Sequence, residues 1–329
     1  MYYQIPEFIG PFKDILPGYI NYQRGLGYDY GRPIVYRLRE MDIFFHEHGY
    51  TKPEITEKMY ESWTAHRGDE KRTNRARRIS AINGLSKYLI NAGHKNIYLG
   101  EPRRGLLKSD FIPYIFSEEE IRNLFSVLKE ELNAESNKYD IATFAVLFSL
   151  YYSCGLRKSE AQRLLIRDVD LNTGKIRIMD GKNHMSRMII TSEPMCRQLS
   201  IYHGGHCIGY EADDFIFRDK NKGCFPEWKI YRTYKRILEQ AGIPRRKGGQ
   251  TQRIHDLRHT FCVRALETMM KKGYDLYTSL PLLSTYLGHK HITETEYYLR
   301  LLDEHFGSIT EMSNKYAPNL FPKADGINV

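Results

Sequence analysis

Residues 254–261, "IHDLRHTF", decide how the rest of this chain is interpreted. Positions i, i+3 and i+4 of a helix lie on one face, so His255, Arg258 and His259 would stand together. Three groups that can carry positive charge repel one another unless an anion lies against them. The two histidines also have the i,i+4 spacing of metal ligands, but the fixed charge of Arg258 opposes a divalent ion. The expected ligand is therefore an anionic oxygen, and no metal site is expected.

Two earlier segments offer cations for the same anion. The segment "CGLRKSEAQRL", 154–164, ends an apolar helix and starts a new one at Arg157, where free backbone N–H groups favour an anion. The turn "DGKNH", 180–184, carries Lys182. Taken alone, Arg157 could pair with Glu160 three residues on, and a turn lysine is usually solvated.

A fourth segment, "LLSTYLGHKHITETEYYLRL", covers residues 282–301. Leu-Gly-His marks a helix end at His289, and a second helix then carries Tyr297 and Tyr298. Adjacent helical residues point about 100° apart, so one tyrosine can pack in a core while the other faces a site.

The order and combination of these segments resemble the tyrosine recombinase family, which includes the phage integrases. The family pattern is G-L-R-x-S-E, a lysine in a β-turn, H-x-L-R-H, and L-G-H with a tyrosine nine residues later. The match covers roughly residues 112–305, and Tyr298 lies nine residues after His289, although Tyr297 is a second candidate. The resemblance implies that Glu160 is a supporting residue. The implied catalytic residues are Arg157, Lys182, His255, Arg258, His289 and the nucleophile Tyr298.

This residue set suits attack by a phenol on a DNA phosphodiester. Arg157 and Arg258 would bind the non-bridging oxygens, and His289 would donate a further hydrogen bond. A phenol has an ordinary pKa near ~10 and a histidine near ~6.5, so His255 is the expected base or proton shuttle. The resemblance places Lys182 as the general acid. Such an exchange of esters needs no ATP, and the sequence predicts no cofactor.

The leading interpretation is site-specific strand exchange between two duplexes through a Holliday junction, by an integrase, a transposon recombinase or a resolvase. The expected partners are double-stranded DNA with paired recombination sites and three further copies in a homo-tetramer, with accessory DNA-bending or directionality proteins as possible additions. A type IB topoisomerase is an alternative enzyme, and a non-catalytic DNA-binding regulator of the same fold is an alternative from another class.

Composition bounds the class of protein. The chain has 329 residues, enough for about two domains, and 49 Lys and Arg against 40 Asp and Glu, a net charge of +9. It has five cysteines and no C-x-x-C, which makes a disulfide framework or a thiolate zinc site unexpected. No signal peptide or membrane span is evident, so the predicted location is cytoplasmic, associated with the bacterial nucleoid when DNA is bound.

Periodicity predicts a mainly α fold with a small antiparallel β-sheet, in two domains. A helical, core-binding-like domain is expected over 1–108, a basic linker over 109–116 and an α+β catalytic domain over 117–329. A Ser117–Glu120 capping box should open the second domain, and 175–179 and 187–191 should form a hairpin. The expected helices are 12–24, 33–48, 55–66, 74–92, 121–132, 141–153, 193–202, 226–241, 255–271, 279–287 and 292–302.

Further basic residues are candidates for DNA contact. Residues 71–108 hold ten Lys and Arg against one acid, Glu101, and 244–253 read "PRRKGGQTQR". The tail, about 303–329, continues an apolar pattern, and in the family such a segment docks on a neighbouring protomer, although packing within the chain is the simpler alternative. The predicted DNA contacts are Arg75, Arg77, Arg78, Lys87, Arg245, Arg246 and Lys247.

Overall fold

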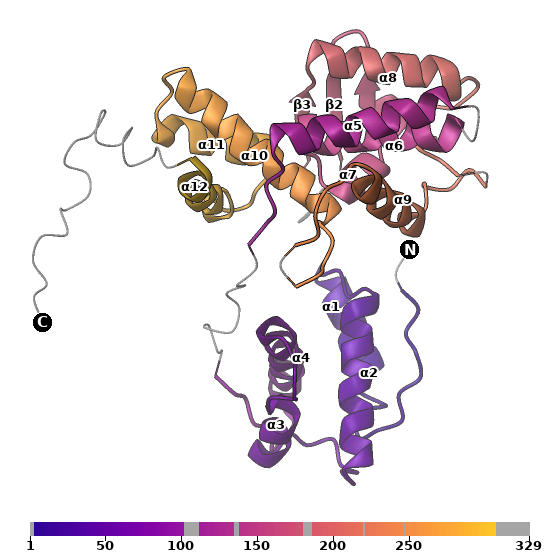
Figure 1. Ribbon diagram of the computed structural model, residues 1–329. Coiled ribbons are helices and arrows are strands. Elements are labelled where there is room, and N and C mark those ends of the chain that lie inside the picture. Colours follow the sequence, from indigo (N-terminus) through magenta and orange to yellow (C-terminus); the bar gives the residue numbers. More distant parts are fainter. Residues whose placement is uncertain are drawn as a thin grey trace, which may run out of the picture. The chain divides into compact units, whose positions relative to one another are not determined.

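The structure is a computed structural model that describes residues 3–101, 112–134, 138–179, 186–219, 221–246 and 248–306. The side chains of 138, 300 and 302–306 lie outside this description. The chain divides into two compact units, Met1–Ile112 and Pro113–Val329, and the division falls within the predicted linker (Figure 1). The predicted class, mainly helical with a small antiparallel sheet, is confirmed.

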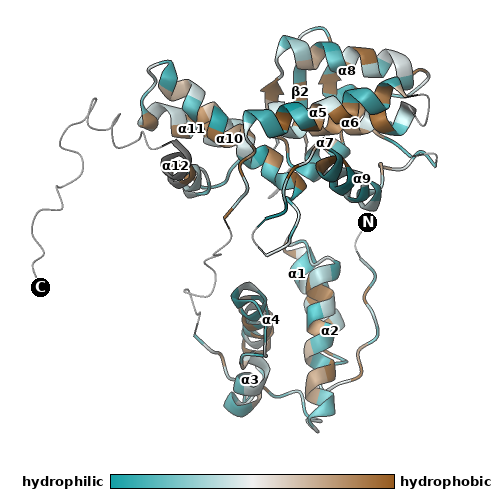
Figure 2. Cartoon of the chain, viewed as in Figure 1, coloured by the Kyte–Doolittle hydropathy of each residue, from teal (hydrophilic) through white to brown (hydrophobic). Residues whose placement is uncertain are grey.

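The first unit packs its helices around one apolar core. Figure 2 shows apolar and polar residues alternating along α2, as expected for a helix with one buried face. Buried Asp42 of this helix accepts hydrogen bonds from the backbone N–H groups of Ile9, Gly10 and Phe12, at 2.7–3.1 Å, and so ties the N-terminal segment to the core. The helices are α1 (Leu16–Gly25), α2 (Arg32–Glu47), α3 (Glu57–Thr64) and α4 (Arg72–Asn91).

Arg78 on α4 corrects one predicted DNA contact. Its side chain is 1% exposed, and its Nε and Nη2 donate to the carboxylate of Glu70, the first at 2.8 Å. It also donates to the carbonyls of Trp63 and Ala65. The prediction that Arg78 binds phosphate is therefore wrong, because its guanidinium is buried and engaged inside the first unit.

The second unit begins with the predicted cap. Ser117 Oγ accepts from Glu120 N at 3.1 Å, and the carboxylate of Glu120 accepts from Ser117 N at 2.8 Å. The central helix α6 is nearly all apolar and contacts α5, α7, α8 and α10. The elements up to the sheet are α5 (Glu118–Asn133), α6 (Lys138–Ser153), α7 (Lys158–Gln162) and the short 3₁₀ helix η2 (Ile166–Asp168).

The sheet of the described residues has three antiparallel strands in the order β1-β2-β3. They are β1 (Val169–Asp170), β2 (Lys175–Ile178) and β3 (Arg187–Ile190). Ile176 pairs with Ile189, and both side chains are buried, whereas Arg177 pairs with Met188 on the exposed face. This register places Arg187 opposite Ile178, at the end of β2 that leads into the hairpin turn.

Three further helices gather around a second, smaller core that includes Cys262, Leu287 and Tyr298 (Figure 1). Helix α11 starts earlier than expected because Asp275 caps it, accepting from Thr278 N at 2.8 Å. None of the described helices is long and apolar enough to cross a membrane. The remaining helices are α8 (Glu193–His206), α9 (Glu227–Gln240), α10 (Ile254–Lys271), α11 (Leu276–Leu287) and α12 (Thr293–Phe306).

Candidate active site

One small cavity of about 290 Å³ collects most of the predicted catalytic residues. They arrive from the start of α7, the first turns of α10, the end of α11 and the middle of α12. Lys182 falls outside the described residues. The cavity is lined by Arg157, His255, Arg258, His259, His289, Glu294, Tyr297 and Tyr298.

Glu160 lies beneath the cavity as a buried anion shared by arginines. Arg157 Nη1 donates to Glu160 Oε1 at 2.7 Å, and Arg187 donates to both carboxylate oxygens at 2.9 and 2.8 Å. Burial alone would raise the pKa of Glu160, but the hydrogen bonds and charges of Arg187 and Arg157 outweigh it and lower this pKa to about 2. The carboxylate is therefore ionised at neutral pH and orders the arginines around it.

The same arginines bind the C-terminal end of α11, where helix carbonyls lack partners within the helix. Gly288 ends this helix with φ of +65°, a conformation that favours glycine, and His289 follows directly. Three consecutive carbonyls each accept from a different arginine. These bonds join Arg187 Nε to Tyr286 O at 2.8 Å, Arg258 Nη2 to Leu287 O at 3.1 Å and Arg157 Nη2 to Gly288 O at 3.0 Å.

Both ring nitrogens of His289 have partners. Nε2 lies 3.2 Å from Arg258 Nη2, and Nδ1 lies 2.8 Å from Thr295 Oγ1. An arginine can only donate, so Nε2 accepts, and the Nδ1 proton of the neutral ring donates to Thr295. In this arrangement His289 is oriented into the cavity by α10 and α12 together.

Tyr298 is 3% exposed, and its ring stacks on that of His289 with centroids 6.4 Å apart. Its hydroxyl lies 3.1 Å from Nδ1 of His259. Burial raises the pKa of Tyr298 well above its usual value, Cys262 adds to the rise, and the charge of Arg258 opposes it. The phenol is therefore protonated in this state. Tyr297 also lines the cavity but is only partly buried.

The two histidines of "HDLRH" stand edge to face, with ring centroids 4.7 Å apart. His255 keeps an exposed surface, yet desolvation of its ring, followed by the charges of Arg258 and Arg253, lowers its pKa. Burial, then His255 and Arg253, lowers the pKa of His259 further. Both rings are neutral at pH 7, so both can accept a proton or a hydrogen bond.

Sequence reasoning missed three residues that support the site. His259 was noticed in the motif but received no role, although it is the histidine that contacts Tyr298. The position of Arg187 at the first residue of the returning strand was its only signal. Thr295 gave no signal, because its partner His289 becomes a neighbour only when α12 packs on α10 and α11.

The predicted DNA contacts differ in exposure. Arg77 and Lys87 are exposed on α4, whereas the half-buried Arg75 donates from Nε to Thr64 O at 2.8 Å. Exposed Arg245 pairs with Glu239 at 2.9 Å, and Arg246 lies 3.8 Å from the buried carboxylate of Asp256. Lys247 falls outside the described residues.

Comparison with known proteins agrees with the geometry of the site. The profile of the phage integrase family matches residues 115–305, more than half of the chain. An integrase/recombinase of Sinorhizobium fredii is 27% identical over 300 residues, covering 88% of this chain and 92% of that protein. The tyrosine recombinase XerC of Chlorobaculum tepidum is 28% identical over 245 residues, covering 68% and 67%.

Two solved structures share the fold. The XerH site-specific recombinase bound to its difH substrate aligns with a TM-score of 0.63 at 18% identity, covering 94% of this chain and all of that one. The Tn1549 transposon integrase in complex with circular intermediate DNA aligns with a TM-score of 0.57 at 15% identity, covering 85% and 93%. The family match and the relatives found by sequence favour a recombinase over a type IB topoisomerase or a non-catalytic regulator. This chain belongs to the phage integrase family, the tyrosine recombinases.

Proposed function

We propose that this protein cuts and rejoins DNA at specific sites through a 3′-phosphotyrosyl intermediate and exchanges strands through a Holliday junction. The observation that carries the proposal is the convergence of Arg157, Arg258, His289 and Tyr298 on one cavity. Family membership implies DNA cleavage and strand transfer, and the relatives XerH and the Tn1549 integrase were solved with DNA. The steps below are our proposal for this chain.

The reaction exchanges one phosphate ester for another. The Tyr298 oxygen forms a bond to phosphorus, the bond from phosphorus to the 5′-oxygen breaks, and a free 5′-hydroxyl leaves. Arg157 and Arg258 line the cavity, and the N–H groups that they do not use on the α11 carbonyls and their other partners would bind the non-bridging oxygens. Lys182, by resemblance, protonates the leaving oxygen.

The phenolic proton needs an acceptor, and this role fell to His255 in the sequence analysis. The structure places His259 in hydrogen-bond contact with Tyr298, and His255 against the His259 ring. We therefore assign His259 as the first acceptor and keep His255 as the base once phosphate enters the cavity. A phosphodiester beside Arg157 and Arg258 would bring negative charge into the cavity. That charge would offset the positive charge of the arginines, which, after desolvation by burial, lowers the pKa of both histidines in the free protein.

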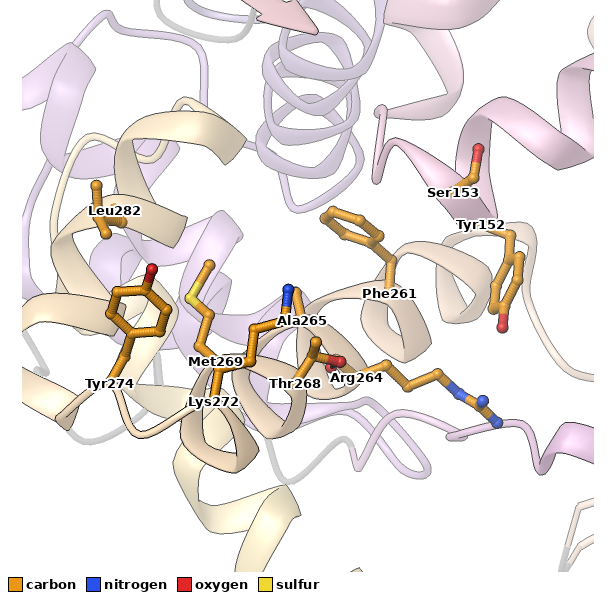
Figure 3. A pocket seen from close by; sticks show the side chains of 10 residues that line it. All are labelled: Tyr152, Ser153, Phe261, Arg264, Ala265, Thr268, Met269, Lys272, Tyr274 and Leu282. Atoms are coloured by element: carbon orange, nitrogen blue, oxygen red, sulfur yellow. Dashed lines mark hydrogen bonds between the residues drawn. The ribbon is translucent and has the colours of Figure 1, made fainter. Parts of the chain in front are cut away.

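Strand exchange between two duplexes requires four copies of the chain, and a groove beside the active site offers a contact between them. This groove, of about 590 Å³, lies on another face of α10 and is lined mainly by apolar side chains from α6, α10 and α11 (Figure 3). Phe261, Met269 and Leu282 line it, with Arg264 and Lys272 also present. We propose that it receives Ile309 and Met312 of a neighbouring copy, which lie in the tail outside the described residues. Head-to-tail contacts of this kind close into a ring.

Covalent trapping tests the reaction and finds the unknown DNA site. The chain is incubated with fragmented DNA of the source genome carrying random nicks, so that the short downstream piece with the new 5′-hydroxyl can diffuse away and leave the upstream strand attached to the protein. Protein-linked DNA is captured under denaturing conditions, the DNA is sequenced and the modified peptide is weighed. We expect one recurrent site and an adduct on Tyr298 with 3′ linkage. Absence of any adduct, or an adduct on another residue, would refute the proposal.

Since DNA is the substrate, the expected place of action is the bacterial cytoplasm, at the nucleoid. Accessory DNA-bending or directionality proteins remain expected partners for the exchange of complete sites. Both points depend on the recombination site recovered by trapping, because its length and flanking sequence show whether additional proteins have room to bind.

A further inference from the structure

Arg187 occupies an unusual place, between the anion that orders the site and the helix end that carries His289. Its Nη1 and Nη2 donate to the two carboxylate oxygens of Glu160, and its Nε donates to the carbonyl of Tyr286. Its side chain is 10% exposed, and it is not among the described residues that line the catalytic cavity. Any influence of Arg187 on the reaction is therefore exerted through other residues.

We propose that Arg187 is a positioning residue that satisfies Glu160 and so keeps Arg258 from bonding to Glu160 in place of the scissile phosphate. This inference rests on the function proposed above. The side chain of Glu160 is 4% exposed, so its charge needs a bidentate partner inside the protein. Arg187 supplies that partner, while Arg258 stands 4.0 Å from Glu160 Oε2, beyond hydrogen-bond distance.

The distances indicate what removal of Arg187 would do. Glu160 would keep the two bonds from Nη1 and the backbone N–H of Arg157 but would lose both bonds from Arg187. Arg258 is the next cation, and a movement of about 1 Å would bring it into contact. A buried carboxylate that has lost two of its four hydrogen bonds favours the closer approach of such a cation. Glu160 would then compete with the DNA phosphate for the arginine that should bind it.

The packing at Gly288 supports a second part of this role. A Cβ built on Gly288 would lie 3.0 Å from Cδ and Nη1 of Arg187, so the turn before His289 rests directly on this arginine. Arg187 therefore fixes the distance between the C-terminal end of α11 and Glu160, because it contacts both. The same contact links the first residue of β3 to the turn that carries His289.

If Glu160 and the DNA phosphate compete for Arg258, a second substitution should partly reverse the effect of the first. Arg187→Met keeps the length of the side chain and removes its charge, which leaves Glu160 to capture Arg258. Adding Glu160→Gln removes the competing anion and should restore part of the activity that Arg187→Met lost. Two independent structural defects would instead add up and make the double variant worse than either single one.

The first readout is single-turnover cleavage of a nicked duplex that carries the site recovered by trapping. We expect Arg187→Met to cleave about 100-fold more slowly, as for the loss of one transition-state donor. Duplex affinity should change little, and the double variant should recover about 10-fold of the loss. Arg187→Lys, which keeps the charge without the fork, should lie between. Arg177→Met on the adjacent strand is the matched control, with the rate of the original chain.

The second readout needs neither DNA nor cleavage. Inorganic phosphate, at constant ionic strength, should raise the melting temperature of the original chain. The part of this rise that an Arg157→Gln variant loses is the part due to phosphate bound in the cavity. Arg187→Met should lose that part of the rise, and the added Glu160→Gln should return it. A melting temperature without ligand for each variant shows that it is folded.

These outcomes separate the two proposals. If the original chain forms no DNA adduct while phosphate protection follows the predicted pattern, the proposed function fails and the role of Arg187 stands. If Arg187→Met keeps phosphate protection, or if the double variant is no better than Arg187→Met in both readouts, the role of Arg187 is wrong.

Discussion

The hydroxyl oxygen of Tyr298 lies 3.1 Å from Nδ1 of His259, although 39 positions separate the two residues in the chain. The contact joins α12 to the first turns of α10, and both residues border the cavity that Arg157 and Arg258 share. Burial raises the pKa of the Tyr298 phenol well above its usual value, so the phenol is neutral in the free protein. The proposed nucleophile therefore already lies in the cavity before DNA binds.

The first prediction concerns the identity of the nucleophile. Tyr298→Phe should abolish the covalent DNA adduct, because the attacking oxygen is gone, while duplex binding remains. Tyr297→Phe is the matched control and should form the adduct at a rate within about threefold of the original chain, since it removes one hydroxyl from a partly buried side chain and keeps the ring. Denaturing gels of the trapped complexes measure both. The reverse result would move the nucleophile to Tyr297.

The second prediction is a pH dependence of stability from the two desolvated histidines at the start of α10. His255 and His259 have pKa values lowered by burial and by their cationic neighbours, from a usual value of 6.5. Below pH 6.5 the unfolded chain binds protons that the folded chain does not, so stability falls as pH falls. The melting temperature should therefore drop between pH 6.5 and 4. His259→Asn should flatten this drop, and an unchanged slope would show that His259 does not contribute.

A third prediction separates the two arginines that we propose bind the phosphate. Arg258 is buried and donates to Gly155 O, Leu287 O and His289 Nε2, a fork that lysine cannot reproduce. Arg258→Lys should slow cleavage by about 100-fold or more and lower the melting temperature by several degrees. Arg157→Lys, at a more exposed position, should slow cleavage comparably with a smaller effect on melting. Equal melting temperatures for the two variants would contradict the assigned burial.

The fourth prediction uses two neighbouring residues of α4. Arg78→Met breaks a buried ion pair with Glu70 and should destabilise the first unit by about 3–5 kcal/mol. Arg77→Met changes an exposed residue and should leave stability intact. If Arg77 binds phosphate, its loss lowers the slope of log affinity against log salt by about 1. Urea unfolding and duplex binding at several salt concentrations measure the two effects, and a stable Arg78→Met protein would contradict the first.

The last prediction concerns assembly. Met269→Glu places a charge in the groove of Figure 3, whose described lining residues differ from those of the cavity that holds Tyr298. A single duplex should still be bound and cleaved at the normal rate, while formation of Holliday junctions from two duplexes should be lost. Native gels of the DNA complexes should show fewer than four copies. Normal formation of Holliday junctions by this variant would show that the groove is not a contact between copies.

Local patterns in the sequence were sufficient for the elements and for most of the site. The 3.6-residue period of α2, the Ser117–Glu120 cap and the alternation in β2 each depend on residues a few positions apart, so short stretches reveal them. The same holds for "HDLRH", whose histidines and arginine share a face by helix geometry alone. The resemblance then named five residues that the structure places around one cavity.

Only the tertiary structure distinguished Arg77 from Arg78. Both lie in the same basic helix, and helical periodicity shows that they point in different directions without showing which direction is occupied by Trp63 and Glu70. Likewise, the roles of Arg187 and His259 depend on partners 27 and 39 positions away. The sequence alone therefore determined the secondary structure and the chemical types at the site, because these follow from neighbouring residues. The partners of each charge were decided by packing, because burial depends on which distant segment covers a side chain.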